Sequence, residues 1–274
     1  MQGISLANGT KKPTDWQTTH WTRAYRTVRN LRQRIFRATQ EGNLKKVRSL
    51  QKLMLKSYSN RLVSVRRVAQ VNAGKKTPGI DGMVVKSPAA RGKLVDTLNQ
   101  YTAWKAKPAR RVYIPKANGK KRPLGMPVWS DKLLAEVIRM ILSAYYDCQF
   151  SDHSHGFREG RRCHTALQEI YHTWKGCVWI IEGDISDCFG SLSHALLIKR
   201  LKENIQDGRF LHLISALLDA GYFEDWEFNR TLSGVPQGGL CKALHKPPYA
   251  KQVTMQRDVR KPWICGHFQL NFFA

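Results

Sequence analysis

Apolar residues recur every three or four positions between residues 21 and 65, and this period constrains the fold more than any other feature of the chain. Such spacing predicts amphipathic α-helices. Gly42 and Asn43 interrupt the pattern, so we expect one helix before them, a second over residues 44–65, and a hairpin between the two. The intervening positions are basic and form the outer faces: Arg23, Arg26, Arg29, Arg32, Arg34 and Arg37 in the first helix, and Lys45, Lys46, Arg48, Lys52, Lys56 and Arg61 in the second.

The basic charge of the chain is concentrated in these helices and in the segment that follows them. Of the formal net charge of +26, residues 1–130 carry 29 Lys and Arg against four acids, whereas residues 131–274 carry 17 basic and 16 acidic residues. A hydrophobic content of 42% excludes a disordered basic tail. The charge therefore favours a nucleic-acid backbone as the partner. The competing interpretation is a solvated surface without a partner, but such surfaces usually mix both signs of charge.

Several other classes of protein do not fit the sequence. No apolar stretch is long enough to span a bilayer and no secretory signal opens the chain, so we expect an intracellular protein without a membrane partner, located in the cytoplasm or alternatively in an organelle. The six cysteines are widely spaced and form no Cys-x-x-Cys pair, so we expect reduced, structural cysteines rather than a zinc site or a disulfide framework. The loop at residues 72–82 contains glycines and lysines but not in the order of a phosphate-binding NTPase loop.

The remainder of the chain alternates predicted helices and strands. Two extended basic runs, residues 110–116 and 120–128, flank Asn118-Gly119 and predict a β-hairpin whose prolines place it at the edge of a sheet. Ser130 is expected to cap a buried helix that runs to Leu142. These elements indicate an α+β fold. Further helices are predicted over residues 161–175, 193–205 and 208–221, and further strands over residues 178–181 and 225–232.

One carboxylate occupies a position that suits metal chemistry. Asp184 follows the apolar run Val178-Trp179-Ile180-Ile181 and should emerge at the rim of a sheet. A carboxylate there is costly unless it is paired, hydrogen-bonded or bound to a metal. Phosphoryl chemistry needs such hard oxygen ligands for Mg²⁺. On its own the position is also typical of an aspartate that caps the next helix.

Five short blocks resemble the blocks of a known family. They are Pro78-Gly79-Ile80-Asp81-Gly82, the ribbon from Arg111 to Pro127, Gly156-Phe157-Arg158-x-Gly160-Arg161, the Asp184 strand, and Gly234-Val235-Pro236-Gln237-Gly238-Gly239. In this order they resemble a group II intron-encoded reverse transcriptase/maturase. The resemblance implies the fingers and part of the palm of a right-hand polymerase. The implied division is a basic helical, RNA-binding N-terminal extension over residues 1–70, fingers over 71–175, a partial palm over 176–240 and an atypical tail over 241–274.

The resemblance also implies roles for individual residues. Asp184 would be the first catalytic aspartate and a ligand of Mg²⁺, with the carbonyl of Ile185 as a second ligand. Phe189 would lie under the incoming sugar and reject a 2′-hydroxyl. Lys116, Arg122 and Gln237 would also bind the nucleotide, although ordinary surface roles stay open for these three. The residues expected to bind RNA are Arg23, Arg26, Arg29, Arg32, Lys45, Lys46, Arg66 and Arg67.

Departures from the family pattern bear on activity. His155 stands where the family usually has Tyr, and Gly190 stands where it often has Asp, but neither change touches a metal ligand. After Leu240 the chain contains no Ser-Pro-Leu-Leu sequence and no Tyr-x-Asp-Asp sequence, and Asp258 is the only acid among residues 241–274. We therefore expect a truncated or frame-shifted tail and an incomplete two-metal site.

Three hypotheses follow from these observations. The chain is the N-terminal portion of an RNA-directed DNA polymerase, with structured intron RNA, a template and primer, and dNTP as partners, and it is unable to polymerise unless a C-terminal fragment is supplied in trans. Alternatively, it is a non-catalytic, maturase-derived module that binds RNA. A third possibility is a pseudogene remnant whose sheet lacks later strands and leaves an edge exposed.

Overall fold

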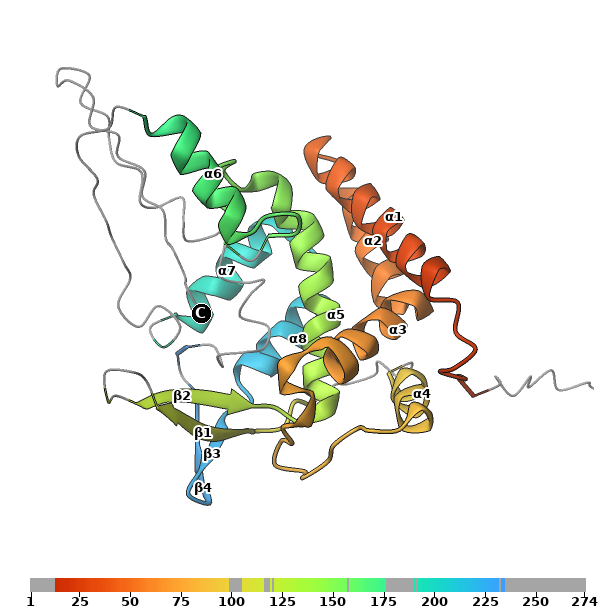
Figure 1. The fold of residues 1–274 in the computed structure, drawn as a ribbon, viewed down its shortest axis with the longest axis vertical. Coiled ribbons are helices and arrows are strands. Elements are labelled where there is room, and N and C mark those ends of the chain that lie inside the picture. The colour runs from red at the N-terminus through yellow and green to blue at the C-terminus, as the bar shows by residue number, and fades with distance from the viewer. Residues whose placement is uncertain are drawn as a thin grey trace, which may run out of the picture.

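A long buried helix, α5 (Trp129–Tyr146), lies at the centre of the fold in the computed structural model, and other helices surround it (Figure 1). The structure describes residues 13–98, 105–115, 119, 121–156, 158–175, 190, 192–231 and 233–234. The other helices are α1 (Trp21–Gln40), α2 (Leu44–Lys56), α3 (Tyr58–Arg66), α4 (Pro88–Thr97), α6 (Cys163–Thr173), α7 (His194–Asn204) and α8 (Gly208–Leu218). The strands are β1 (Ala109–Pro115), β2 (Lys121–Met126), β3 (Tyr222–Glu224) and β4 (Glu227–Asn229).

The predicted N-terminal helical hairpin is confirmed, with one correction. α1 ends at Gln40 and α2 begins at Leu44, on either side of the expected break, and Gly42 has a positive φ of 67°. The predicted helix over residues 44–65 is wrong as a single element, because it is divided at Ser57 into α2 and α3. Ser57 has extended backbone, and its hydroxyl accepts the backbone N–H of Asn60 at 3.3 Å. Serine side chains stabilise the N-terminal ends of helices in this way. A new helix therefore begins after Ser57, although the hydrophobic period continues unchanged from α2 into α3.

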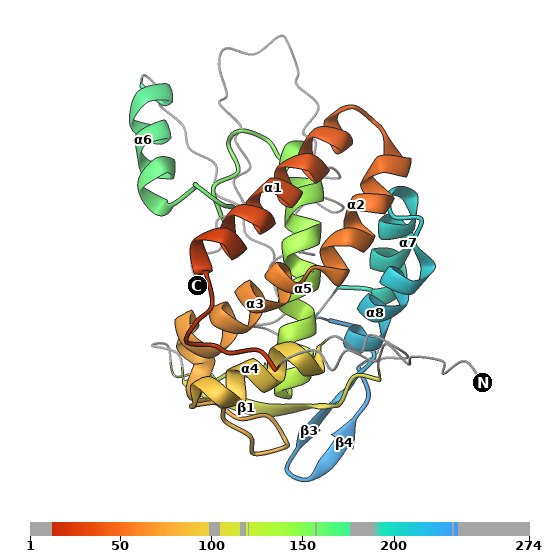
Figure 2. The same cartoon turned by 90° about the vertical axis from the view of Figure 1, so that its right-hand side faces the viewer.

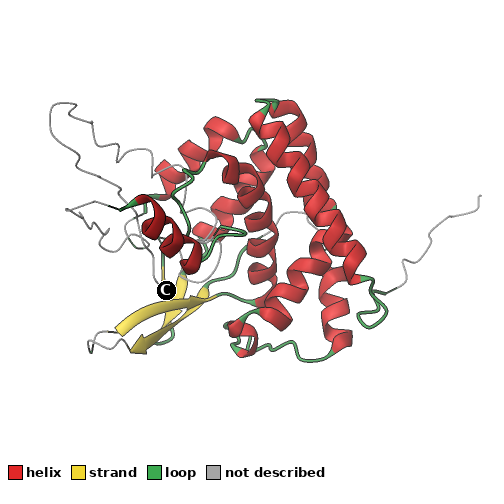
Figure 3. Cartoon of the chain, turned by 45° about the horizontal axis from the view of Figure 1, so that its top comes forward, coloured by secondary structure: helices red, strands yellow, loops and turns green. Residues whose placement is uncertain are grey.

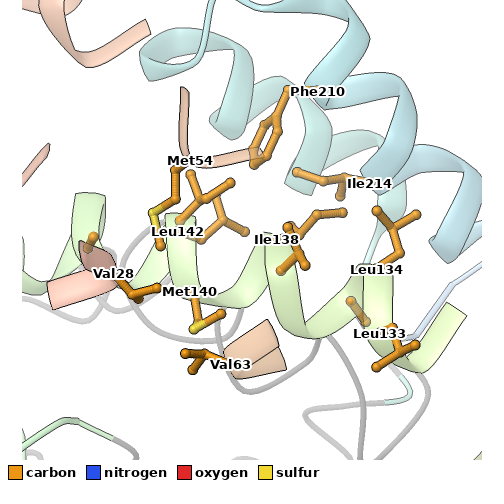
Figure 4. Packing of buried hydrophobic residues seen from close by; sticks show 14 of the residues in the cluster. Val28, Met54, Val63, Leu133, Leu134, Ile138, Met140, Leu142, Phe210 and Ile214 are labelled. Atoms are coloured by element: carbon orange, nitrogen blue, oxygen red, sulfur yellow. The ribbon is translucent and has the colours of Figure 1, made fainter. Parts of the chain in front are cut away.

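The core joins the N-terminal helices to the second half of the chain. α5 packs against α1, α2 and α3 on one side and against α8 on another (Figure 2). Figure 4 shows Leu134 and Ile138 of α5 near Ile214 of α8, while Val63 of α3 lies below Met140. The same buried cluster includes residues of all these helices. Helices α1 to α3 therefore share one hydrophobic core with α5 and α8.

α5 begins two residues earlier than predicted and has a different cap. Val128 is the N-cap residue and offers no side-chain hydrogen bond, so the expected capping by Ser130 is wrong. In the first turn the carboxylate of Asp131 accepts the backbone N–H of Lys107 at 2.8 Å, and Asp131 is buried. The negative charge of Asp131 at a helix N-terminus supplies the stabilisation that a capping serine would have provided.

The strands form one sheet at an edge of the molecule, clear of most helices (Figure 3). Its order is β2-β1-β3-β4, with β1 and β2 antiparallel as the Asn-Gly pair predicted. The hairpin lies at one edge of the sheet, as its prolines predicted, and Ala109 and Arg110 of β1 join it to the sheet by pairing in parallel with Tyr222 and Phe223 of β3. β2, which contains Pro123, is the edge strand. The sheet and the helices together confirm the mixed α+β class.

Of three further predictions, one is corrected and two lie outside the described residues. In place of the predicted strand over residues 225–232, β3 and β4 form a hairpin. Its turn residues Asp225 and Trp226 both have positive φ, 49° and 69°, as a tight primed turn requires. The predicted strand over residues 178–181 and the tail over residues 241–274 lie outside the described residues.

Of the remaining α-helices, α4 was not predicted from the sequence, whereas the others lie at the expected places. α6, α7 and α8 confirm the three helices predicted between residues 161 and 221. Cys148 and Cys163 are free thiols, and the other four cysteines lie outside the described residues. None of the helices in the described ranges is long and apolar enough to cross a membrane.

Candidate nucleic-acid interface

The outer face of α1 carries a row of exposed arginines. Arg23 and Arg26 lie three residues apart, and Arg34 and Arg37 follow at spacings that return to the same side of a helix. Arg29 lies at the border of this face and is also exposed. None of these five forms an ion pair with another residue in the described part of the chain, and α1 itself contains no acid. The face therefore presents uncompensated positive charge to solvent.

A second basic row follows the outer side of α2. Lys45, Arg48, Lys52 and Lys56 recur at spacings of three or four residues, which places them on one side of the helix. Lys45 is exposed, and the ammonium group of Lys52 lies 3.8 Å from the carboxylate of Asp207 at the start of α8. Lys46 lies apart from this row, with its Nζ 3.2 Å from the Glu41 carboxylate. The two expected RNA-binding lysines thus differ, because Glu41 already compensates the charge of Lys46.

Arg32 differs from the other arginines of α1, because its side chain is 22% exposed and forms an ion pair with Glu159. Glu159 belongs to the segment Gly156-Phe157-Arg158-Glu159-Gly160, which leads toward α6. In the same segment the Arg158 guanidinium is 3.0 Å from the Asp147 carboxylate and also donates to the carbonyls of Ser151 and Ser154. Arg32 therefore attaches this loop to α1 through its ion pair with Glu159, a contact that the spacing of the arginines in the sequence did not predict.

Arg66 and Arg67, at the junction of α3 and a π-helical turn over Arg67–Val71, contact different partners. The Arg66 guanidinium lies 4.4 Å from the ring centroid of Trp21 and 5.5 Å from that of Tyr25. The Arg67 guanidinium lies 3.2 Å from the carboxylate of Glu136 on α5, while the Arg67 side chain stays exposed. Arg66 thus places a positive group beside the first turns of α1, whereas Arg67 is paired with a carboxylate of α5.

The β1–β2 ribbon is also basic, and part of its charge is engaged at its base. The Arg111 guanidinium stacks 3.4 Å from the centroid of the Tyr222 ring and lies 3.4 Å from the Glu224 carboxylate. The Tyr113 hydroxyl donates a hydrogen bond to Glu224, which raises the pKa of the Tyr113 phenol. Arg122 lies on β2 opposite Ile114 and is partly buried. Lys116, its expected partner in nucleotide binding, lies outside the described residues.

The loop that carries Pro78-Gly79-Ile80-Asp81-Gly82 is fixed against the start of α5. The Trp129 indole donates to the Met83 carbonyl at 2.6 Å, and the Lys132 ammonium donates to the Thr77 carbonyl at 2.7 Å. Burial lowers the pKa of Lys132. A Cβ on Gly79 would lie 2.8 Å from the backbone of Pro127 and Val128. Glycine is therefore needed at position 79 for close backbone contact.

His155, which departs from the family pattern, is buried and hydrogen-bonded. Its ring nitrogens contact the Thr165 hydroxyl at 2.8 Å and the Glu169 carboxylate. The same carboxylate also contacts His153. Hydrogen bonding, from His153 above all and then from His155, lowers the pKa of Glu169. His155 therefore holds the loop to α6.

Asp184 and Ile185, expected to bind the metal ion, and Phe189 and Gln237, expected to bind the nucleotide, lie outside the described residues. The structure does describe chain segments close to them in sequence. The Gly234 N–H donates to the Leu192 carbonyl at 2.8 Å, and the His194 ring contacts the Gly234 carbonyl. The chain just after Phe189 and the chain just before Gln237 are thus held side by side. Within the described ranges there is no group of three or more His, Cys, Asp or Glu side chains that could hold a metal ion.

Three residues of the candidate interface were not among those expected to bind RNA. Arg34 and Arg37 share the exposed face of α1, where the helical period had placed them. Tyr25 was expected among the apolar positions but is 44% exposed beside Arg66. No local pattern signals this arrangement, since α1 and α3 are brought together by the core.

Comparison with known proteins identifies related sequences over most of the chain. Residues 16–98 match the N-terminal domain of reverse transcriptase, and residues 114–245 match the reverse transcriptase (RNA-dependent DNA polymerase) domain. The chain is 42% identical over 179 residues to the group II intron-encoded protein LtrA of Lactococcus lactis subsp. cremoris, which covers 63% of this chain and 29% of that protein. It is 38% identical over 188 residues to an uncharacterized 91 kDa protein in the cob intron of Schizosaccharomyces pombe (66% of this chain, 23% of that one). A nuclear intron maturase 1, mitochondrial, of Arabidopsis thaliana is 33% identical over 92 residues (34% and 13%).

Proposed function

The chain belongs to the group II intron-encoded reverse transcriptase/maturase family, and on that premise we propose that its N-terminal helices bind structured intron RNA. The chain spans less than a third of the length of LtrA. We further propose that the whole protein acts in intron splicing, intron mobility and DNA synthesis. The chain would contribute the RNA-binding extension, the fingers and part of the palm to that work.

The observation that carries the proposal is the uncompensated charge of the α1 face. Arg23, Arg26, Arg34 and Arg37 are exposed and lack acidic partners among the described residues. RNA phosphates offer the negative charge that would neutralise such a row, and the displaced counterions supply much of the binding free energy. Because α1 and α2 pack on α5, RNA bound here would be held rigidly relative to the rest of the domain.

For the nucleotide site the proposal rests on the family resemblance. Asp184 and the carbonyl of Ile185 would bind a Mg²⁺ ion, which would supply Lewis-acid stabilisation of the transferring phosphoryl group. Lys116 and Arg122 would hold the triphosphate, and Phe189 and Gln237 would shape the pocket around the sugar. Carboxylate and carbonyl oxygens are suitable ligands for Mg²⁺. The fingers and palm arrangement belongs to the same proposal.

We expect the 274-residue polypeptide not to extend a primer by itself. Two-metal catalysis needs carboxylates that hold two ions about 3.5 to 4 Å apart. The sequence contains no pair of adjacent aspartates after Asp184. Mg²⁺-dependent, template-directed dNTP incorporation that disappears in Asp184→Ala would contradict this expectation. A non-catalytic RNA-binding module remains the second candidate, and it predicts RNA affinity that Asp184→Ala leaves unchanged.

RNA binding itself is tested by a salt titration with a structured RNA hairpin as the probe. Affinity of the wild type should fall by orders of magnitude between roughly 50 and 200 mM salt. Arg23→Ala, Arg26→Ala and Arg37→Ala combined should reduce the slope of log affinity against log salt by about three, roughly one for each phosphate contact. The matched control removes the same charge elsewhere by combining Lys199→Ala, Lys202→Ala and Arg209→Ala on α7 and α8, and should keep the slope. A wild-type affinity that does not respond to salt would refute the proposal.

A further inference from the structure

Tyr25 occupies an unusual position for an aromatic residue in an amphipathic helix. It follows Trp21 by one helical turn and precedes Arg29 by another, so the three lie along one side of α1. Tyr25 is 44% exposed although the Arg66 guanidinium covers part of its ring at 5.5 Å from the centroid. The exposed area therefore belongs to the part of the ring that Arg66 does not cover.

The residues next to Tyr25 are held in place by contacts with other parts of the chain: α3, the segment before α1, and α5. Arg66 of α3 also stacks 4.4 Å from the centroid of Trp21. Trp21 in turn contacts the buried Trp16 ring edge-to-face, with centroids 4.7 Å apart. Arg67, next to Arg66, is held by Glu136 of α5. The tyrosine ring thus stands on a rigid support, which reduces the entropy lost when a ligand stacks on it.

The charge around Tyr25 distinguishes it from other exposed aromatic residues. Arg26 and Arg29 flank it on α1, and the Arg66 guanidinium of α3 lies over part of its ring. By contrast, Trp226 is 98% exposed but stands between the carboxylates of Asp225 and Glu227, which would repel a phosphate. The Tyr58 hydroxyl is hydrogen-bonded to Thr14 at 3.0 Å, and Thr14 also binds the Asp96 carboxylate. Only Tyr25, of these three, combines an open ring with a wholly basic surrounding.

We propose that Tyr25 is a stacking site for an unpaired base of the RNA bound by α1. Arg66 supports the ring from beneath, and Arg26 and Arg29, which have no acidic partner among the described residues, neutralise the flanking phosphates. Aromatic rings on a basic surface bind single-stranded nucleic acid in this way, because every base has a flat face to stack. A paired base inside a duplex cannot reach such a ring. The inference rests on the proposed RNA binding and specifies the RNA element, a loop or single strand, that the Tyr25 surface recognises.

The test compares two RNA probes with the same number of phosphates. One is a single strand that carries 2-aminopurine, whose fluorescence reports stacking, and the other is a blunt duplex. Tyr25→Ala should weaken single-strand binding by about 5- to 150-fold and abolish 2-aminopurine quenching, with little effect on the duplex. The salt slope should not change, since stacking releases no counterions. Arg29→Ala, which removes a charge, should lower the slope by about one.

Three further variants separate stacking from a folding defect. Tyr25→Phe should bind both probes as the wild type does, because the ring is kept. Tyr25→Leu keeps apolar bulk without a flat ring and should bind like Tyr25→Ala. Tyr58→Ala removes another exposed tyrosine and should leave single-strand binding intact. Equal losses on both probes, or unchanged single-strand binding in Tyr25→Leu, would overturn the inference while leaving RNA binding in place. If the wild type bound neither probe, the proposed function would fail and this inference with it.

Discussion

Replacement of Gly79 by Ala tests whether the loop over residues 72–86 is fixed against the start of α5. An added Cβ would lie 2.8 Å from the Pro127 carbonyl oxygen and equally close to two backbone atoms of Val128. Ordinary contact begins near 3.4 Å, so the loop must move away by about 0.6 Å. The φ angle of Gly79 is not positive, and alanine can adopt it. The substitution therefore probes crowding rather than backbone strain.

Crowding of this kind costs about 1–3 kcal/mol. The loop movement would also weaken the 2.6 Å hydrogen bond from Trp129 to the Met83 carbonyl, which contributes about 0.5–1.5 kcal/mol. Alanine returns about 0.4–1 kcal/mol by restricting the unfolded chain. We expect a net loss of about 1–3 kcal/mol in the free energy of unfolding, measured by urea denaturation followed by circular dichroism.

Gly156→Ala is the matched control, since a Cβ there would meet no atom within 4 Å and φ is not positive. Its stability should stay within about 0.5 kcal/mol of the wild type. If Gly79→Ala were as stable as Gly156→Ala, the close contact between the loop and the start of α5 would be wrong. A stable Gly79→Ala would also remove the physical reason for a glycine in that block.

Three more predictions concern the core, the His–Glu contacts and Arg32. Ile138→Ala, at a fully buried position of α5, should lower the free energy of unfolding by about 2–5 kcal/mol. Leu53→Ala, at a residue that is 48% exposed, should lower it far less. Equal losses in urea denaturation would argue against α5 as the centre of the core. Hydrogen bonds lower the pKa of Glu169 from its ordinary 4.5, so the stability that its carboxylate contributes is complete above about pH 4.5 and is lost as pH falls below that value. Glu169→Gln should therefore flatten the acid side of a curve of unfolding free energy against pH. An unchanged curve would contradict this prediction. Arg32→Ala should change the salt slope of RNA binding less than Arg26→Ala does, because Glu159 already neutralises Arg32; equal reductions would show that Arg32 also contacts phosphate.

The sequence predicted those features that depend on residues close together along the chain. The period of α1 and α5, the break at Gly42-Asn43 and the Asn118-Gly119 hairpin all follow from local spacing and turn chemistry. The break at Ser57 could not be read in this way, because the apolar residues keep the same phase on both sides of it. The turn at Asp225 and Trp226 also escaped prediction, since aspartate followed by tryptophan is not a usual pair for positive φ.

Features of the candidate interface that were missed depend on contacts far apart in sequence. Arg32 pairs with Glu159, and Arg67 pairs with Glu136, so two expected RNA-binding residues have partners that no local pattern reveals. The pairing of β1 with β3 likewise joins segments more than one hundred residues apart. Tyr25 looked like a core residue because its spacing matches the apolar face of α1. Only the packing of α3 against α1 shows that its ring is partly exposed beside Arg66.

The central claim, that RNA lies on the basic surfaces of α1 to α3, is tested most directly by ultraviolet crosslinking of a protein–RNA complex followed by mass spectrometry. We expect crosslinked peptides from residues 21–71, including the peptide that contains Tyr25. The exposed basic residues Lys199, Lys202 and Arg209 of α7 and α8 serve as the internal comparison. Crosslinks concentrated on α7 and α8, with none on α1 to α3, would contradict the claim.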